Sequence, residues 1–253
     1  QVAVFDTAFH QTISAEVFRY AIPSKFYKEN KIRVYGFHGT SHKYVSGKAI
    51  DYLKKENSKI ITIHLGNGCS MTAVKDGKSI DTSMGFGPMN GLIMGTRAGD
   101  IDQSVIFYLV DQLGYDAEKV KNMLNYEAGM TGLTGHNDMR DVIAKIESGD
   151  KEALLAYQMY AYRIRKYIGA YTAALNGLDA IVFTGGIGEN DRLMRKLCCS
   201  NLDYLGIQFD EEKNNSSLKV LREINTDNSR VSILVIPTDE ELEIAMQCYA
   251  LLG

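Results

Sequence analysis

Residues 59–83 constrain the fold most, because they combine an uninterrupted apolar strand, a glycine turn and a hairpin in KIITIHLGNGCSMTAVKDGKSIDTS. The run at 59–66 is rich in β-branched residues, which is typical of a strand buried on both faces. In segment 70–83, Asp76-Gly77 joins two stretches in which apolar and polar residues alternate, which is a strong short-range signal for a β-hairpin. A buried strand joined to an antiparallel hairpin predicts a mixed sheet covered by helices.

The remaining elements predict an α/β domain built around that sheet. With 253 residues, of which 45% are hydrophobic, the chain is long enough for a substantial core. A strand is expected in the opening residues before Asp6. Hydrophobic periodicity predicts helices at 42–56, 102–113, 116–125 and 151–176, and strands at 179–186 and 231–237. A last helix is expected after Pro237, with Thr238 as its N-cap and Glu241 closing a capping box.

Charge and cysteine content exclude several classes of function. The formal net charge is -3 and the pI is near 6.0, which predicts no nucleic acid and no membrane surface as a partner. The four cysteines lack the spacing of a zinc site or a disulfide framework and indicate reduced thiols. With neither a long apolar stretch nor a signal-peptide pattern, we expect a cytoplasmic protein.

Two glycine-rich segments follow predicted strands, where phosphate-binding turns belong. HLGNGCS (64–70) and FTGGIGEN (183–190) could present backbone N–H groups to an anion, although HLGNGCS is about as well explained as a tight turn. Neither segment has the spacing of the dinucleotide fingerprint, and no P-loop occurs in the sequence. If the chain binds a nucleotide, it uses another architecture.

The segment GFHGTSH (36–42) carries an unusual density of polar side chains ahead of a predicted helix. For His42 we favour a structural explanation, in which Ser41 or Thr40 caps the helix. For His38 the flanking glycines favour a functional role.

Two further loops carry charged candidates. Arg97 stands between glycines in MGTRAGDID, where it could bind a carboxylate or phosphate, or form a surface ion pair with Asp100 or Asp102. In HNDMRD, Asp138 and Arg140 could pair with each other or contact a nucleotide.

Seven motifs taken together are far more specific than any one alone. In chain order they are VFDTAFH, YGFHGTSH, HLGNG, GTRAGD, DMRD, FTGGIGEN and IPTDEE. This series resembles the acetate kinase family, which belongs to the acetate and sugar kinase, Hsp70 and actin superfamily. The resemblance implies a ribonuclease-H-like, actin-like ATPase lobe with a mixed β-sheet flanked by helices. It also implies acetate and ATP as substrates, ATP/ADP with Mg2+ or Mn2+ as cofactors, and a homodimer.

The resemblance assigns roles to four charged residues. Asp6 and Glu240 would position the metal, Arg97 would clamp the phosphoryl group and the acetate, and His38 would donate to the phosphoryl oxygens. Such a site fits phosphoryl transfer, which needs positioning and charge stabilisation more than a covalent nucleophile.

The resemblance also implies the residues that hold the nucleotide. They are the phosphate-loop residues His64, Gly66, Asn67 and Gly68, the adenosine-loop residues Gly185, Gly186, Ile187, Gly188 and Asn190, and the neighbouring Asp138, Met139 and Arg140.

No counterpart of the family's N-terminal lobe is recognisable in the sequence. We therefore expect the whole chain, residues 1–253, to be a C-terminal nucleotide-binding lobe with a core at about 12–240. Segments 1–11 and 241–253 would pack on the other lobe. We expect the chain alone to bind nucleotide without turnover. A propionate or butyrate kinase, a pyrophosphate-dependent relative and a non-catalytic nucleotide-binding module of the actin or Hsp70 type remain alternatives.

Overall fold

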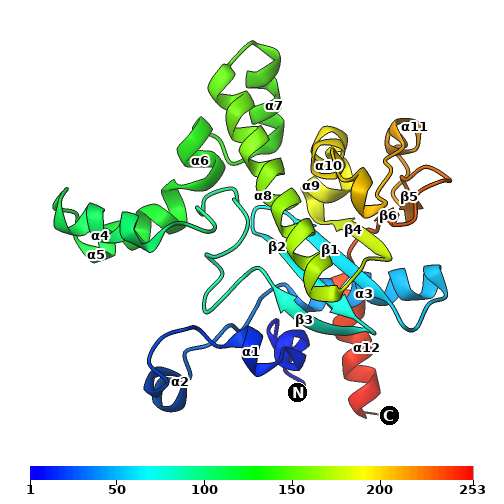
Figure 1. Ribbon diagram of the computed structural model, residues 1–253, viewed down its shortest axis with the longest axis horizontal. Helices are drawn as coiled ribbons and strands as arrows, with labels where there is room; N and C mark the ends of the chain where they lie inside the picture. Colours follow the sequence, from blue (N-terminus) through cyan, green and yellow to red (C-terminus); the bar gives the residue numbers. More distant parts are fainter. Residues whose placement is uncertain (253) are drawn as a thin grey trace.

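A computed structural model describes residues 1–252 and contains a six-stranded sheet in the order β3-β2-β1-β4-β6-β5 (Figure 1). The pairs β1–β4 and β4–β6 are parallel, whereas β1–β2, β2–β3 and β5–β6 are antiparallel. The predicted mixed sheet and its predicted internal strands are therefore confirmed. The strands are β1 (Lys59–Leu65), β2 (Cys69–Lys75), β3 (Lys78–Thr82), β4 (Ala180–Thr184), β5 (Arg222–Glu223) and β6 (Ser232–Val235).

Helices supply most of the remaining structure, and the predicted ones at 102–113, 116–125 and 151–176 are present. The segment predicted at 116–125 divides into α5 and a π-helical turn, η2. The α-helices are α1 (Ala15–Phe18), α2 (Lys25–Asn30), α3 (Gly39–Leu53), α4 (Gln103–Asp111), α5 (Ala117–Asn122), α6 (Gly129–Thr134), α7 (Met139–Glu147), α8 (Lys151–Leu175), α9 (Gly185–Asn190), α10 (Arg192–Cys199), α11 (Glu211–Asn214) and α12 (Glu240–Leu252). The other helical turns are η1 (Ala8–Thr12), η2 (Met123–Glu127) and η3 (Asp203–Leu205).

The hairpin between β2 and β3 turns at the predicted dipeptide. Asp76 has φ 52° and Gly77 has φ 74°, so both central residues lie in the left-handed region. A two-residue hairpin needs this conformation to match the twist of its strands, and Asp and Gly are among the few residues that adopt it readily.

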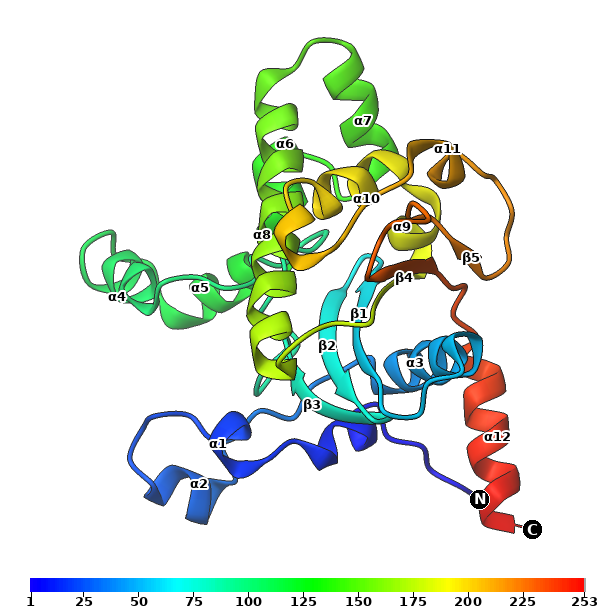
Figure 2. The ribbon, with the colours of Figure 1, turned by 45° about the vertical axis from the view of Figure 1, so that its right-hand side comes forward.

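Helices cover both faces of the sheet, and alternate residues of the central strands pack against each layer. Ile60 and Val182 belong to a core with Val45 and Ala49 of α3. On the opposite face, Ile61, Ile63 and Phe183 pack in a larger core that includes Tyr157, Tyr160 and Ile164 of α8. Figure 2 shows α8 on one side of the sheet and α3 on the other. Burial on both faces explains why β1 and β4 are continuously apolar.

The strand expected in the opening residues is absent from the described part of the chain. Residues 1–5 pair with no strand, and the first regular element is η1. The chain is instead tied to the start of α3, where the Gly39 N–H donates to the Asp6 carbonyl at 2.8 Å. The expectation was wrong because an apolar run does not specify whether a strand neighbour exists.

The cap predicted for the last helix was also wrong. The Leu242 N–H donates to Asp239 Oδ1 at 2.9 Å, so Asp239 supplies the capping carboxylate. The Thr238 hydroxyl lies 2.9 Å from Ser41 Oγ and is engaged in a tertiary contact instead.

Parts of the surface expose apolar side chains. Several apolar side chains of α12 are at least 40% exposed, among them Leu242, Ile244 and Met246. Phe5 is 68% exposed. Packing of 1–11 and 241–253 on a further lobe stays a prediction, and Gly253 of that segment lies outside the described residues.

Helices α4 and α5 extend away from the sheet (Figure 1). Within residues 1–252, every helix is too short or too polar to cross a bilayer.

Asp81 is a carboxylate buried at the edge of the sheet. It pairs with Ala73 in the β2–β3 register, so its side chain shares the face covered by α8. Its Oδ1 accepts the Thr82 N–H at 2.7 Å, and Tyr167 and Tyr171 of α8 lie close to its charge. No ion pair to Asp81 occurs among residues 1–252. Burial raises the pKa of Asp81 to about 6.

We predict that Asp81→Asn stabilises the chain at pH 7.5 and has little of this effect at pH 4. A raised carboxyl pKa means that the folded state binds more protons than the unfolded state between about pH 4 and 6, so stability falls as pH rises through this window. The gain at pH 7.5 should be on the order of 1–3 kcal/mol. Urea unfolding of the variant and the unmodified chain at both pH values measures the difference in their free energy of unfolding. The same difference at pH 4 and at pH 7.5 would contradict the burial argument.

Candidate functional site

Asp6 lies against the start of α3 and fixes the backbone there. The His38 N–H donates to Asp6 Oδ2 at 2.5 Å, and the Gly39 N–H donates to the Asp6 carbonyl at 2.8 Å. A Cβ atom on residue 39 would collide with that carbonyl, so only glycine permits this approach. His38 itself has φ 55°, a strained conformation for a non-glycine residue. The junction therefore holds the Asp6 carboxylate and the His38 ring in one place.

Three of the predicted site side chains converge on the Gly68 turn. The His38 and His64 rings have centroids 4.5 Å apart. A Cβ atom on Gly68 would lie 3.3 Å from the His38 ring and 3.5 Å from Arg97 Nη1, so the bare backbone of Gly68 faces both groups. The turn is also tight, because the Gly66 N–H donates to the Gly68 carbonyl at 3.1 Å. The two explanations of HLGNG are thus compatible, since a tight turn can also present amide groups.

Glu240 completes the acidic side of this cluster. Burial, followed by the negative charge of Asp6, raises the pKa of Glu240. The two predicted metal-associated carboxylates are therefore neighbours, although Glu240 begins α12 and Asp6 precedes η1. No group of three or more His, Cys, Asp or Glu side chains able to hold a metal occurs in the described residues.

Arg97 does not form the surface ion pair considered as an alternative. Its Nη1 donates to the Pro88 carbonyl at 3.0 Å. Asp100 lies 3.8 Å from Arg163, and Asp102 caps α4 by accepting the Ser104 N–H. Because its hydrogen-bond partner is a neutral carbonyl, the Arg97 guanidinium retains the capacity to bind an anion.

A buried chain of polar groups leads from His38 into the core. His38 Nδ1 lies 2.9 Å from Ser70 Oγ, which lies 2.7 Å from His42 Nε2, and His42 Nδ1 lies 2.7 Å from Thr62 Oγ1. Burial lowers the pKa of His42 well below its usual value and that of His38 as well, which favours neutral rings. A neutral ring donates at one nitrogen and accepts at the other.

Neutral rings allow this chain two consistent directions of donation. When Ser70 donates to His38 Nδ1, the hydrogen of His38 resides on Nε2. When Ser70 instead donates to His42 Nε2, His38 donates through Nδ1 and its Nε2 carries no hydrogen. Ser70 therefore couples the tautomer of His38 to that of His42.

The helix-cap explanation for Ser41 and Thr40 was wrong. Residue 38 occupies the N-cap of α3 without a side-chain cap bond, and the helix begins at Gly39 rather than at 42. Ser41 Oγ instead lies 2.8 Å from His64 Nδ1 and 2.9 Å from Thr238 Oγ1. Sequence reasoning missed this contact because its partners are far apart in the chain. The density of hydroxyl and imidazole groups in GFHGTSH was its only signal.

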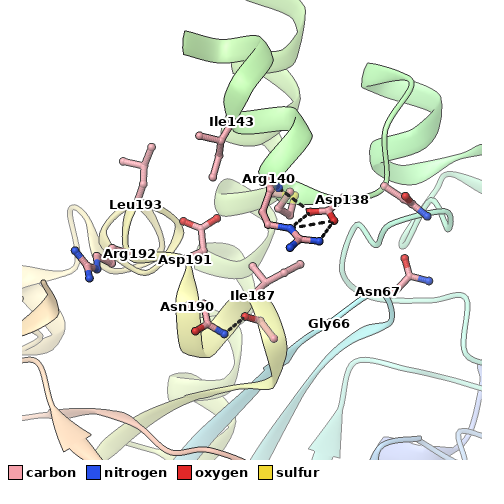
Figure 3. A pocket seen from close by; sticks show the side chains of 13 residues that line it. Gly66, Asn67, Asp138, Arg140, Ile143, Ile187, Asn190, Asp191, Arg192 and Leu193 are labelled. Carbon is pink, nitrogen blue, oxygen red and sulfur yellow. Dashed lines mark hydrogen bonds and ion pairs between the residues drawn. The ribbon is translucent and has the colours of Figure 1, made fainter. Parts of the chain in front are cut away.

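A cavity of about 780 Å3 opens beside the Gly66 turn (Figure 3). Its walls come from the turn after β1, from the start of α7, and from α9 with the start of α10. Sequence reasoning missed the apolar wall formed by Ile143 and Leu193, although Ile143 lies four residues after Met139 on one helix. The predicted nucleotide residues that line the cavity are Gly66, Asn67, Asp138, Met139, Arg140, Gly186, Ile187 and Asn190.

Asp138 and Arg140 form the pair that we considered as one alternative. Arg140 Nη2 donates to Asp138 Oδ2 at 2.5 Å, and Asp138 also caps α7 by accepting the Arg140 N–H (Figure 3). The side-chain hydrogen bond from Arg140 lowers the pKa of Asp138 to about 2. Arg140 is exposed and lines the cavity, so it can still meet a ligand there.

The predicted adenosine loop is the first turn of a helix. Thr184 ends β4 and the helix α9 begins at once with Gly185. Gly185 has φ 77°, and a Cβ atom there would meet the Leu65 backbone, which only glycine avoids. Gly188 is buried against the sheet, whereas Gly186 faces open space in the cavity. Gly185 and Gly188 therefore allow close packing, and Gly186 leaves room for a ligand.

Sequence comparison identifies related proteins over the whole chain. The acetokinase family profile matches residues 1–246. The acetate kinase of Flavobacterium johnsoniae is 68% identical over 252 residues, which are 100% of this chain and 64% of the relative. The acetate kinase of Clostridium acetobutylicum is 51% identical, with the same two shares.

Solved structures agree on the fold. The Porphyromonas gingivalis acetate kinase superposes with a TM-score of 0.96 at 43% identity, covering 99% of this chain and 63% of that chain. A Francisella tularensis propionate kinase gives a TM-score of 0.91 at 50% identity, with shares of 96% and 62%. The expected mixed lobe of the acetate kinase superfamily is thereby confirmed. The chain spans about 64% of the length of the first curated relative.

We predict that Gly186→Leu abolishes nucleotide binding without unfolding the chain. A side chain at this helical position would enter the cavity. A Cβ atom placed on Gly186 meets no other part of the chain within 4 Å, so the leucine would not collide there at its Cβ. Calorimetric titration with ADP should show saturable binding for the unmodified chain and none for the variant. Gly47→Leu is the matched control, because Gly47 is an exposed helical glycine of α3 with open space at its Cβ. Equal ADP affinity of Gly186→Leu and the unmodified chain would exclude this cavity.

Proposed function

The chain belongs to the acetokinase family, and from this premise we propose that it serves the reversible transfer of a phosphoryl group between ATP and acetate, giving acetyl phosphate and ADP. One observation carries the proposal. The 780 Å3 cavity adjoins, at the Gly66 turn, a cluster of one arginine, two histidines and two carboxylates. Because the chain spans 64% of the length of its relative, this activity is proposed for the whole protein.

The geometry supports a nucleotide whose base enters the cavity and whose phosphates point to the cluster. Ile143, Ile187 and Leu193 provide apolar walls for a base, while Asn67 and Asn190 provide amides. The Gly66 N–H donates within its own turn, so we propose that the Gly68 amide and the first turn of α9 offer backbone N–H groups to the phosphate oxygens. His64 lies beside the His38 ring, and its Nε2 would be 3.6 Å from a Cβ atom placed on Gly66.

Arg97 and His38 are the groups that we propose to act on the transferred phosphoryl. Both face the Gly68 backbone, so both can reach an oxyanion bound there. Charge stabilisation of this kind supplies most of the catalysis in phosphoryl transfer. Acetate is already ionised well above a carboxyl pKa of roughly 4, so it needs no base.

The Asp6 and Glu240 carboxylates fit Mg2+ or Mn2+. Burial and then the charge of Asp6 raise the pKa of Glu240, which places the two acids within electrostatic reach of each other. Magnesium takes one or two protein carboxylates and completes its shell with water and phosphate oxygens, so two acids are sufficient. When bound, the ion neutralises charge on the phosphates. Asp6 also keeps the His38 backbone in place through its accepted N–H bond.

Three finer points belong to the same proposal. Acetate is favoured over propionate by the names of the curated relatives, but a 50% identical structure is a propionate kinase, and one methylene changes discrimination by only about 1–3 kcal/mol. A homodimer is supported by the exposed apolar side chains of α4, including Phe107 and Tyr108. The guanidinium of Arg97 beside His38 favours a kinase over a non-catalytic nucleotide-binding module.

A chimera tests the proposed activity. We replace the matching part of Flavobacterium johnsoniae acetate kinase with this chain and measure acetyl phosphate from acetate and MgATP. We expect turnover in the chimera, none in the isolated chain, and a loss of about 10²–10³ in kcat with Arg97→Gln, because a charge-stabilising donor is removed. A folded chimera that binds ATP without forming acetyl phosphate would refute the proposal. Parallel assays with propionate and butyrate identify the preferred acid.

We also predict that Ser70→Ala lowers kcat of the chimera by about 10–100-fold while leaving KM for ATP nearly unchanged. The variant breaks the hydrogen-bond chain that couples His38 to His42, and the cavity is untouched. Ser79→Ala is the matched control, because Ser79 is a buried serine bonded to His10 Nδ1. Equal kcat values in the two variants would show that Ser70 acts only through stability.

A further inference from the structure

A second cavity, of about 280 Å3, lies beside the nucleotide cavity and is strongly cationic. Its lining includes Arg192, Arg195, Lys219 and Arg222, with Glu189 as the one carboxylate among the described lining residues. Arg192 lines both cavities, and Figure 3 shows its side chain directed away from Asp138 and Arg140. The α9–α10 junction therefore forms a wall between the two spaces.

None of the four cations forms a close ion pair with a carboxylate of the described residues. Across residues 1–252, no ion pair within 4.0 Å involves any of them. Nearby lysines behave differently, because Lys196 pairs with Glu211 at 2.6 Å and Lys213 pairs with Asp227 at 2.7 Å. The cations around this cavity thus form no close ion pair in a region where other lysines do, and Glu189 is the one carboxylate in the described lining against four positive charges.

Arg195 is fully buried and bonds only to neutral oxygens. Its Nε donates to Asn214 Oδ1 and its Nη1 to the Gly188 carbonyl, both at 2.8 Å. Burial, and then the positive charge of Arg222, lowers the pKa of Arg195 to about 10. Arg195 Nη2 also donates to the Asn214 carbonyl at 3.3 Å, and these three bonds offset part of the cost of burying the charge, so an anion in the adjoining cavity would be further stabilising.

Arg222 of the same lining also donates to backbone carbonyls. Its Nη2 donates to the Glu189 carbonyl at 2.9 Å and its Nη1 to the Leu218 carbonyl at 2.5 Å. Its Nε is buried and has no acceptor among the described residues. Oε1 of Glu189 already accepts the Gly185 and Thr238 N–H groups, at 3.1 and 3.3 Å.

A structural role, in which arginines bind backbone carbonyls, explains only some of the cations around the second cavity. Arg195 and Arg222 both hold carbonyl oxygens of α9, which is a structural role. Lys219 and Arg192 are exposed, and their side chains have no hydrogen-bond acceptor in the part of the chain that the structure describes. A purely structural role therefore leaves two of the four cations unexplained.

We propose that this second cavity is an anion-binding site for a small phosphate-bearing molecule, separate from the nucleotide cavity. Arginine guanidinium groups match phosphate oxygens in geometry and charge, and Ser216 and Ser217 at the rim add hydroxyl donors. A water molecule takes about 30 Å3 in the liquid, so the cavity has room for a phosphate and several carbon atoms. The site requires neither acetate nor nucleotide.

Calorimetric titration of the chain with inorganic phosphate tests the proposal. Phosphate could also bind near Arg97, so Arg97→Gln is titrated in parallel to remove that site. We expect saturable binding that survives Arg97→Gln and weakens at least tenfold with Lys219→Glu, which reverses an exposed charge at the cavity rim. Arg222→Gln should weaken binding similarly if the variant folds. Lys166→Glu, an exposed charge reversal on α8, should change nothing.

Two results would overturn the assignment. One is the absence of saturable phosphate binding by the unmodified chain, and the other is binding lost with Arg97→Gln but retained with Lys219→Glu. Titrations with glycerol 3-phosphate and succinate then separate a phosphomonoester from a dicarboxylate, and tighter binding of succinate would contradict the phosphate class. ADP binding, measured on the same Lys219→Glu sample, should be unchanged, which keeps this site distinguishable from the proposed kinase function.

Discussion

The close approach of Gly39 to Asp6 is the contact on which the candidate site depends. Two backbone N–H groups at the start of α3 donate to the carboxylate and carbonyl of Asp6. This contact brings the opening segment, which belongs to no strand, to the edge of the sheet. It also holds His38 in a left-handed conformation that aims its ring at the Gly68 turn. Without a glycine at 39 the helix could not begin there, and the acid and the imidazole would separate.

The parallel pairing of β1 with β4 explains why two glycine segments 120 residues apart act together. Leu65 and Thr184 end neighbouring strands that run in the same direction, so the Gly66 turn and the first turn of α9 emerge at one edge. Ligands of open α/β sheets bind beyond the carboxyl ends of strands for this reason. The contact of Gly185 with the Leu65 backbone shows how closely the two segments approach.

Polar groups buried beneath this edge distinguish it from an ordinary apolar core. His10, His42 and Ser70 are almost completely inaccessible, yet each has hydrogen-bond partners. Such networks are stabilising only when every member is satisfied, and they then hold one arrangement of side chains. The network therefore links the orientation of His38 to the packing of α3 on the sheet. Around the second cavity, by contrast, four cations face a single carboxylate, Glu189, among the described residues, which is why an external anion is expected there.

Local sequence determined the strands, the Asp76-Gly77 hairpin, the long helices and the motifs that indicate the family, because period, β-branching and turn chemistry act over a few residues. It failed for the opening strand, for the caps at Ser41 and Thr238, and for the apolar wall at Ile143 and Leu193. Each of these depends on a partner that is distant in the chain: the neighbour available to a strand, the histidine opposite a hydroxyl, or the helix across a cavity. The family resemblance grouped Asp6, His38, Arg97 and Glu240 in one site, but only the tertiary structure decided how they lie around the Gly68 turn and that Arg195 and Arg222 share a cavity, because strand order and helix packing set these distances.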